Sequence, residues 1–188
     1  PRGYKITISC SRSMPGMSTA TGFDGLEGGN IGFGAKFKAD ARRYYGSFIG
    51  MSTRGQMVPN KDCFCEIDPE TKDQWGIPAL RFHWKWGEHE LKQVAHQQKS
   101  MTALIEAMGG RISRPPTGDP SQAINEPGLA IHEVGGAMMG ADPAHSVCDR
   151  WNRIWEVKNL LLADGAVFTG NASKNPTLTN MALAWRRS

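Results

Sequence analysis

Residues 81–110 read RFHWKWGEHELKQVAHQQKSMTALIEAMGG. The first six residues alternate between aromatic and polar side chains, which predicts a β-strand with one buried face. The aromatic face comprises Phe82, Trp84 and Trp86, and the polar face comprises Arg81, His83 and Lys85. From about Glu88 to Met108 the apolar residues recur at helical spacing and stop at Gly109-Gly110, which predicts an amphipathic helix. A strand followed by a long helix is the most regular part of the chain.

Upstream of this stretch the pattern changes. Residues Tyr4–Cys10 alternate β-branched or aromatic residues with polar ones and predict a half-buried strand. The stretch from Met14 to Gly34 is rich in glycine, with scattered Ser, Thr and Asn, and predicts a loop. Strands, a helix and further strands follow one another without regular alternation, so the fold class is predicted to be α+β.

Bulk composition indicates a folded globular chain. It has 188 residues, of which 39% are hydrophobic and 21% charged, and its net charge of +4 slightly favours anionic partners. No apolar run approaches the roughly 20 residues needed to cross a bilayer, so no transmembrane segment is expected. The chain starts at Pro1 instead of Met, which leaves its localisation open.

The four cysteines suggest no redox or metal chemistry. Cys10, Cys63, Cys65 and Cys148 match neither a zinc-binding nor a haem-attachment spacing. We expect them to be structural thiols.

The segment 131–140 places His132 shortly before Gly135-Gly136 among small apolar residues. Small residues beside a histidine allow a bulky planar group to come close to the backbone. On its own, however, this motif is more typical of a turn histidine whose hydrogen bonds are made to the backbone.

The C-terminal residues suggest two further elements. Residues 159–168 predict a buried strand that enters a tight Asp164-Gly165 turn with free backbone N–H groups. Asn175 is then expected to be the N-cap of the last helix, with Pro176 at its first position. The N-terminus of a helix stabilises negative charge, although an ordinary capped helix would have the same sequence.

Taken together, these motifs form an ordered series. The series is His132-x-x-Gly135-Gly136-x-x-Met139-Gly140, Asp142-Pro143, Ser146-Val147-x-Asp149, Asn159-Leu160, Asp164-Gly165 and Asn175-Pro176-Thr177. It resembles the C-terminal signature of the glucose-methanol-choline (GMC) oxidoreductases. The stretch from Arg54 to Trp86 is also similar to the substrate-side region of bacterial members.

The resemblance implies a bound FAD and oxidation of the CH–OH group of a sugar, polyol or other alcohol, with hydride passing to the flavin. His132 matches the active-site base, and Asn175 matches the partner that hydrogen-bonds the substrate oxygen. An imidazole suits a general base because its ordinary pKa is about 6.5. Asp164 and Gly165 match the turn near the FAD pyrophosphate, and the helix start at Pro176 and Thr177 matches contacts to the flavin ring.

The chain departs from the family in one respect. The family binds the adenosine half of FAD with a Rossmann G-x-G-x-x-G motif, and this sequence contains none. We therefore expect an antiparallel-sheet substrate domain at 1–130, and at 131–188 an active-site segment whose strand and helix complete an FAD-binding domain. The partner would be the N-terminal FAD-binding portion of the same protein, so the isolated fragment should be inactive. The alcohol, the electron acceptor and the choice between oxidase and dehydrogenase stay open.

Two alternatives belong to other functional classes. His83, His89 and His96 could bind a metal, although their spacing fits no H-E-x-x-H site. A basic binding module could use Arg42-Arg43 beside two tyrosines, but so short a patch makes nucleic acid an unexpected partner.

Overall fold

The computed structural model describes residues 3–10, 34–129, 131–171 and 173–186. The loop predicted at 14–34 lies outside the described residues, apart from Gly34. The described chain divides into two compact units. One unit comprises 3–10, 34–55 and 92–123, and the other comprises 56–91 and 124–186.

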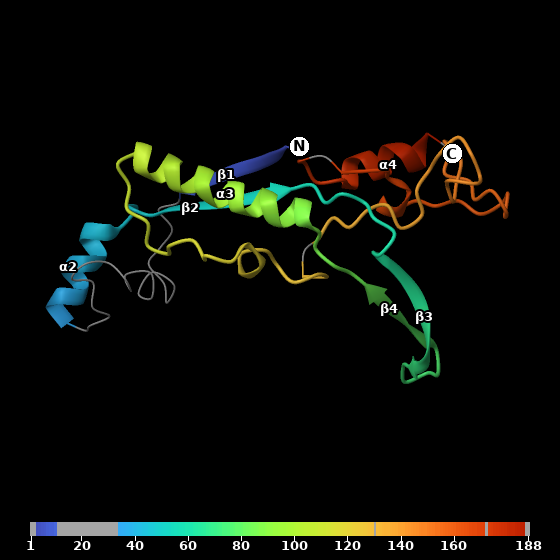
Figure 1. Ribbon diagram of the computed structural model, residues 1–188, viewed down its shortest axis with the longest axis horizontal. Helices are drawn as coiled ribbons and strands as arrows, with labels where there is room; N and C mark the ends of the chain where they lie inside the picture. The colour runs from blue at the N-terminus through green and yellow to red at the C-terminus, as the bar shows by residue number, and fades with distance from the viewer. Residues whose placement is uncertain (1–2, 11–33, 130, 172, 187–188) are drawn as a thin grey trace. The chain divides into compact units, whose positions relative to one another are not determined.

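The first unit contains a two-stranded antiparallel sheet of β1 (Tyr4–Cys10) and β2 (Ile49–Gly55). It also contains α2 (Gly34–Tyr44) and most of α3 (Glu88–Ala107) (Figure 1). Hydrogen bonds join the sheet to α3: Tyr4 Oη lies 2.7 Å from His96 Nδ1, and Thr53 Oγ1 donates to Gln97 Oε1 at 2.8 Å. Each of the two strands is therefore joined to α3 by a side-chain hydrogen bond.

Both regular elements predicted for this part of the chain are confirmed. The strand at Tyr4–Cys10 has the predicted bounds, and α3 ends one residue before the predicted end. Gly109 terminates the helix with φ +71°, a left-handed conformation that glycine adopts without steric cost. The N–H groups of Gly109 and Gly110 donate to Glu106 O and Ile105 O, both at 2.9 Å.

In the second unit, β3 (Phe64–Lys72) and β4 (Pro78–His83) form an antiparallel hairpin (Figure 1). The strand predicted at 81–86 is confirmed only for residues 81–83, because β4 starts earlier, at Pro78, and ends at His83. The prediction that the aromatic face of this strand is buried is wrong for Phe82, which is 69% exposed. The physical reason is that, among the described residues, this sheet has only two strands and nothing covers that face.

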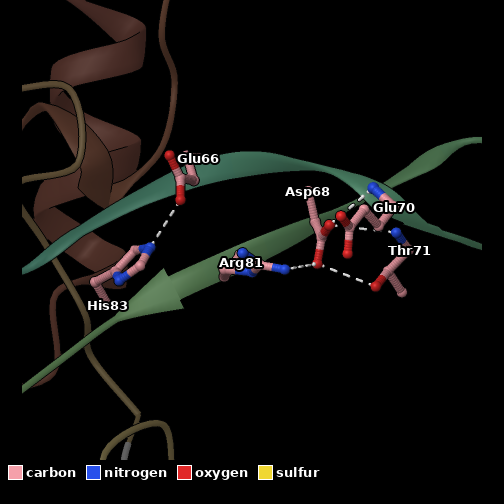
Figure 2. Close-up of polar contacts among 6 residues, drawn as sticks. All are labelled: Glu66, Asp68, Glu70, Thr71, Arg81 and His83. Atoms are coloured by element: carbon pink, nitrogen blue, oxygen red, sulfur yellow. Dashed lines mark hydrogen bonds and ion pairs between the residues drawn. The ribbon is translucent and has the colours of Figure 1, made fainter.

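The other face of the hairpin is polar, and its charges are paired (Figure 2). Arg81 Nη2 donates to Asp68 Oδ2 at 2.7 Å, and His83 Nε2 lies 2.9 Å from Glu66 Oε1. Asp68 also accepts hydrogen bonds from the backbone N–H of Glu70 and Thr71. The N–H of Glu70, followed by the other hydrogen bonds, lowers the pKa of Asp68 to about 2.

The C-terminal part of this unit is ordered with little regular structure. Its core consists of Cys148, Val167 and Phe168, and Val134, Met139, Leu162 and Leu183 pack against it. Backbone hydrogen bonds connect distant segments, as when Met139 N–H donates to Val167 O at 2.9 Å. The regular elements here are the short 3₁₀ helix η2 (Gly165–Val167) and the helix α4 (Thr177–Trp185), whereas a second 3₁₀ helix, η1 (Pro120–Gln122), belongs to the first unit.

The buried strand predicted at 159–168 is wrong. Leu160 and Leu161 are 47% and 46% exposed, and the described residues 131–186 form isolated bridges instead of a strand. The run of apolar residues ends in the 3₁₀ helix η2, because the Asp164 carboxylate accepts a hydrogen bond from the Ala166 N–H and caps a turn at this point. Two small antiparallel sheets with helices nevertheless agree with the predicted α+β class.

None of the described helices is both long enough and apolar enough to span a lipid bilayer.

Candidate functional site

Gly165 is the point at which three segments of the C-terminal part meet. A Cβ built on Gly165 would lie 3.4 Å from Val134 Cγ1, 3.5 Å from Glu133 O and 3.8 Å from Asn180 Nδ2. The 131–140 segment, the Asp164-Gly165 turn and α4 are therefore in contact. These are the segments that carry the site residues predicted from the sequence.

The turn itself is held by Asp164. Its exposed carboxylate accepts a hydrogen bond from Ala166 N–H at 2.9 Å and so caps η2. The next residue, Val167, is 1% exposed and lies in the core. The N–H of Gly165 has no hydrogen-bond partner among the described residues, as the sequence predicted for at least one N–H of this turn.

The paired glycines lie along the same turn. Ala137 N–H donates to Ala166 O at 2.9 Å, which aligns the 131–140 segment with η2. Gly135 has φ +91°, and a Cβ there would lie 3.5 Å from Phe168 O. A residue with a side chain would be strained in this conformation, so glycine allows the segment to follow the turn closely.

His132 precedes this region in an uncommon backbone conformation. Its φ is +79°, a left-handed conformation that few residues other than glycine adopt, although histidine adopts it more often than most. The imidazole is half-buried and makes no hydrogen bond to a described residue. The backbone-bonded turn histidine that we considered as an alternative is therefore not what the described residues form. Strained residues with free side chains occur often at functional sites.

The start of α4 differs from the prediction by one residue. The helix begins at Thr177, its N-cap is Pro176, and no side chain makes a capping hydrogen bond. The prediction of Asn175 as N-cap is therefore wrong: the first helical residue is Thr177, and the first turn is closed by Asn180 N–H donating to Pro176 O at 2.9 Å. Asn175 and Thr177 are exposed, and their side chains make no hydrogen bond to a described residue.

The structure thus brings together the segments of the predicted site. The side chains of His132, Asn175 and Thr177 make no hydrogen bond to a described residue and could bind a ligand. Among the described residues, no hydrogen bond joins His132 to Asn175, Asp164 or Thr177. A shallow hollow of about 300 Å³ adjoins the paired glycines, and its lining includes Gly135, Gly136, His145 and Ser146. The imidazole of His145 lies 2.7 Å from Asp142 Oδ2, and this contact lowers the pKa of Asp142 after the larger effect of the Ala144 N–H.

Asp149 organises the stretch 149–153, although we assigned it no role from the sequence. It accepts hydrogen bonds from Trp151 N–H at 2.7 Å and from Arg153 N–H at 3.0 Å, and Arg153 Nη2 lies 2.7 Å from its second oxygen. Burial raises the pKa of Asp149, but the hydrogen bonds from Arg153 and Trp151 outweigh it and the net shift is downward. An acidic residue four positions before an arginine was the available sequence signal.

Asn180 was also missed, because a single asparagine inside a helix carries no motif. Its side-chain oxygen is buried without a hydrogen bond from any described residue. For the metal alternative, the described residues contain no group of three or more His, Cys, Asp or Glu side chains arranged to hold an ion.

The comparisons with known proteins agree with this arrangement of motifs. A family model described as GMC oxidoreductase matches residues 59–184. The chain is 28% identical over 184 residues to a 2-methyl-1,2-propanediol dehydrogenase of Mycolicibacterium austroafricanum, covering 98% of this chain and 31% of that protein. It is 29% identical over 185 residues to the fructose dehydrogenase large subunit of Gluconobacter japonicus, covering 98% and 30%.

A third relative is the gluconate 2-dehydrogenase flavoprotein of Pantoea cypripedii, which is 25% identical over 158 residues, or 84% of this chain and 26% of that protein. The chain therefore spans less than a third of the length of these curated relatives. Because the family model matches well over half of its residues, the chain belongs to the GMC oxidoreductase family.

Proposed function

We propose that these residues are the substrate-facing and active-site portion of an FAD-dependent enzyme that oxidises the CH–OH group of a sugar, polyol or other alcohol. The relatives include dehydrogenases named for a diol, a sugar and a sugar acid, and also C-glycoside 3-oxidases. The carrying observation is the junction at Gly165, where the three motif-bearing segments touch. Whether the enzyme is an oxidase or a dehydrogenase is left open in the proposal.

The residues at this junction fit a flavin dinucleotide. Glycines at 135, 136 and 165 leave the backbone uncovered, and the N–H of Gly165 is available to an anionic oxygen. When bound, FAD supplies the acceptor for the hydride. In this proposal Asp164 and Gly165 adjoin its pyrophosphate, while Pro176 and Thr177 start a helix whose dipole favours negative charge near the ring.

The residues of the chain have separate tasks in the proposed reaction. His132, whose imidazole has no hydrogen-bond partner among the described residues, takes the proton from the substrate hydroxyl oxygen as hydride leaves the carbon that bears this oxygen. The exposed amide of Asn175 donates a hydrogen bond to the substrate oxygen and holds it in place. The left-handed backbone of His132 sets the direction of its ring relative to the glycine segment that follows.

The division of labour along the chain is part of the same proposal. Residues 1–130 belong to the substrate side, and 131–188 contribute the active-site segment and complete the flavin domain. The three relatives named above are more than three times as long as the matched regions, which supports a nucleotide cradle elsewhere in the whole protein. The 188 residues alone would then be inactive.

The test is the visible spectrum of the full-length protein before and after adding a panel of sugars and alcohols. We expect flavin bands that bleach with one substrate class, and a rate of bleaching that falls by about 10²–10⁴ in His132→Ala. His145→Ala is the matched control, since it removes an exposed imidazole from the same part of the chain and should bleach at the normal rate. A folded full-length protein without flavin bands would overturn the proposal.

A further inference from the structure

Two N–H donors without a protein partner meet at the Asp164-Gly165 turn. The backbone N–H of Gly165 donates to no described residue, because the Asp164 carboxylate accepts the next N–H, that of Ala166. Asn180 Nδ2 lies 3.8 Å from the position that a Cβ would take on Gly165, and it too has no hydrogen bond to a described residue. The Asn180 amide of α4 thus lies beside the turn that carries the unpaired Gly165 N–H.

The orientation of the Asn180 amide is not explained by packing. Its oxygen Oδ1 is buried and accepts no hydrogen bond from the described residues, although the residue as a whole is only half-buried. A buried acceptor without a donor lowers stability, and an aliphatic side chain of the same shape would avoid this cost. An asparagine here is therefore better explained by what its nitrogen can bind.

The face of α4 that carries Asn180 is held against the body of the unit. Leu183, three residues later and on the same helical face, packs against the core cluster. The opposite side of α4 is open, with Leu178 79% and Met181 63% exposed. The amide is therefore positioned beside Gly165 by a packed contact one turn away.

We infer that Asn180 binds FAD in the full-length protein, with Nδ2 donating to an oxygen of the FAD pyrophosphate next to the N–H of Gly165. This inference rests on the proposed function. Phosphate oxygens accept several N–H donors at once, and converging backbone and amide N–H groups are a common way to bind them. Because the amide is neutral, it adds a donor without adding a charge beside the Asp164 carboxylate.

The test compares two substitutions that differ in what they remove. Asn180→Leu removes the donor and keeps a similar volume, whereas Asn180→Asp keeps the shape and the acceptor oxygen but replaces the donor by a negative charge. FAD is titrated into the apoprotein of each full-length variant, and binding is followed by quenching of flavin fluorescence. Asn159→Leu makes the same substitution at an exposed asparagine of the same unit and serves as the control.

The expected order of FAD affinity is wild type, then Asn180→Leu, then Asn180→Asp. The loss of a hydrogen bond to a charged group predicts at least about a tenfold rise in the dissociation constant for Asn180→Leu. Repulsion of the pyrophosphate predicts a larger rise for Asn180→Asp, and one that shrinks as salt is added. Asn159→Leu should bind FAD like the wild type.

Each other outcome counts against the inference. Wild-type affinity in both variants would overturn it and leave the proposed function intact, and so would an Asn180→Asp variant that binds better than Asn180→Leu, since that order requires an acceptor. Wild-type apoprotein that binds no FAD would overturn the proposed function as well. Circular dichroism of each apoprotein monitors folding, and if Asn180→Leu does not fold, the near-isosteric Asn180→Asp decides.

Discussion

The β3–β4 hairpin and the segment from 131 to 168 belong to the same unit, but they obtain their order in opposite ways. The hairpin has regular strand pairing, yet Ile67, Leu80 and Phe82 are 66%, 59% and 69% exposed. The 131–168 segment has isolated bridges and a single 3₁₀ turn, yet its Cys148 and Val167 are only 0% and 1% exposed. Regular backbone pairing and side-chain burial are therefore separate properties, and the candidate site lies in the region that has the burial.

The largest expected difference between the two regions comes from removing a phenylalanine ring. Phe168→Ala should lower the free energy of unfolding by about 3–5 kcal/mol, because Phe168 is 9% exposed and its removal leaves a cavity. Phe82→Ala should cost less than about 1 kcal/mol, since its ring is largely in water. Urea unfolding of the 188-residue chain measures both, and a similar loss in the two variants would mean that the open face of the hairpin is covered in solution.

A smaller difference is expected between the acidic residues of the two regions. Asp149→Ala leaves the N–H groups of Trp151 and Arg153 and the Arg153 guanidinium without their acceptor, which should cost about 1–3 kcal/mol. Asp149→Asn keeps one acceptor oxygen and should lose less. Glu66→Gln in the hairpin should change the unfolding free energy little, because both partners of the Glu66–His83 pair are well exposed. Equal losses for Asp149→Ala and Glu66→Gln would contradict this comparison.

The smallest expected effect is the acid pH dependence that Asp68 contributes in the hairpin. The pKa of Asp68 is lowered from 3.8 to about 2, so its stabilising contribution is complete above pH 3.8 and is lost as the pH falls through about 2. The stability difference between the wild type and Asp68→Asn should therefore shrink over this acid range. Asp62→Asn is the control, because the Asp62 carboxylate accepts no hydrogen bond from a described residue. A difference that is constant with pH would show that Asp68 acts by shape alone.

The sequence predicted the locally determined elements and failed where order depends on distant residues. The strand at Tyr4–Cys10 and the helix at Glu88–Met108 have a clear period, and both were found. Residues 159–168 have an apolar run that suits a strand, but their hydrogen bonds go to single residues of other segments, which no local period encodes. Phe82 alternates correctly, but alternation alone does not say whether a covering layer is present.

The candidate site was predicted from the order of its motifs. His132, Asp164-Gly165 and Asn175 were singled out because they follow one another as in a known family, and the structure joins their segments at Gly165. The positive φ of His132 and the free amide of Asn180 could not be predicted. Both depend on how the chain turns in three dimensions, and neither residue type signals that geometry.

The burial of Cys148 gives the protein an internal reporter. Its thiol is fully buried, and burial, with a smaller contribution from the charge of Asp149, raises its pKa. Because the thiolate is the reactive form, alkylating reagents can modify Cys148 only when the 131–168 segment opens, whereas Cys10 and Cys65 are exposed from the start. The rate at which the buried thiol is alkylated would thus time the opening of the segment that carries the candidate site.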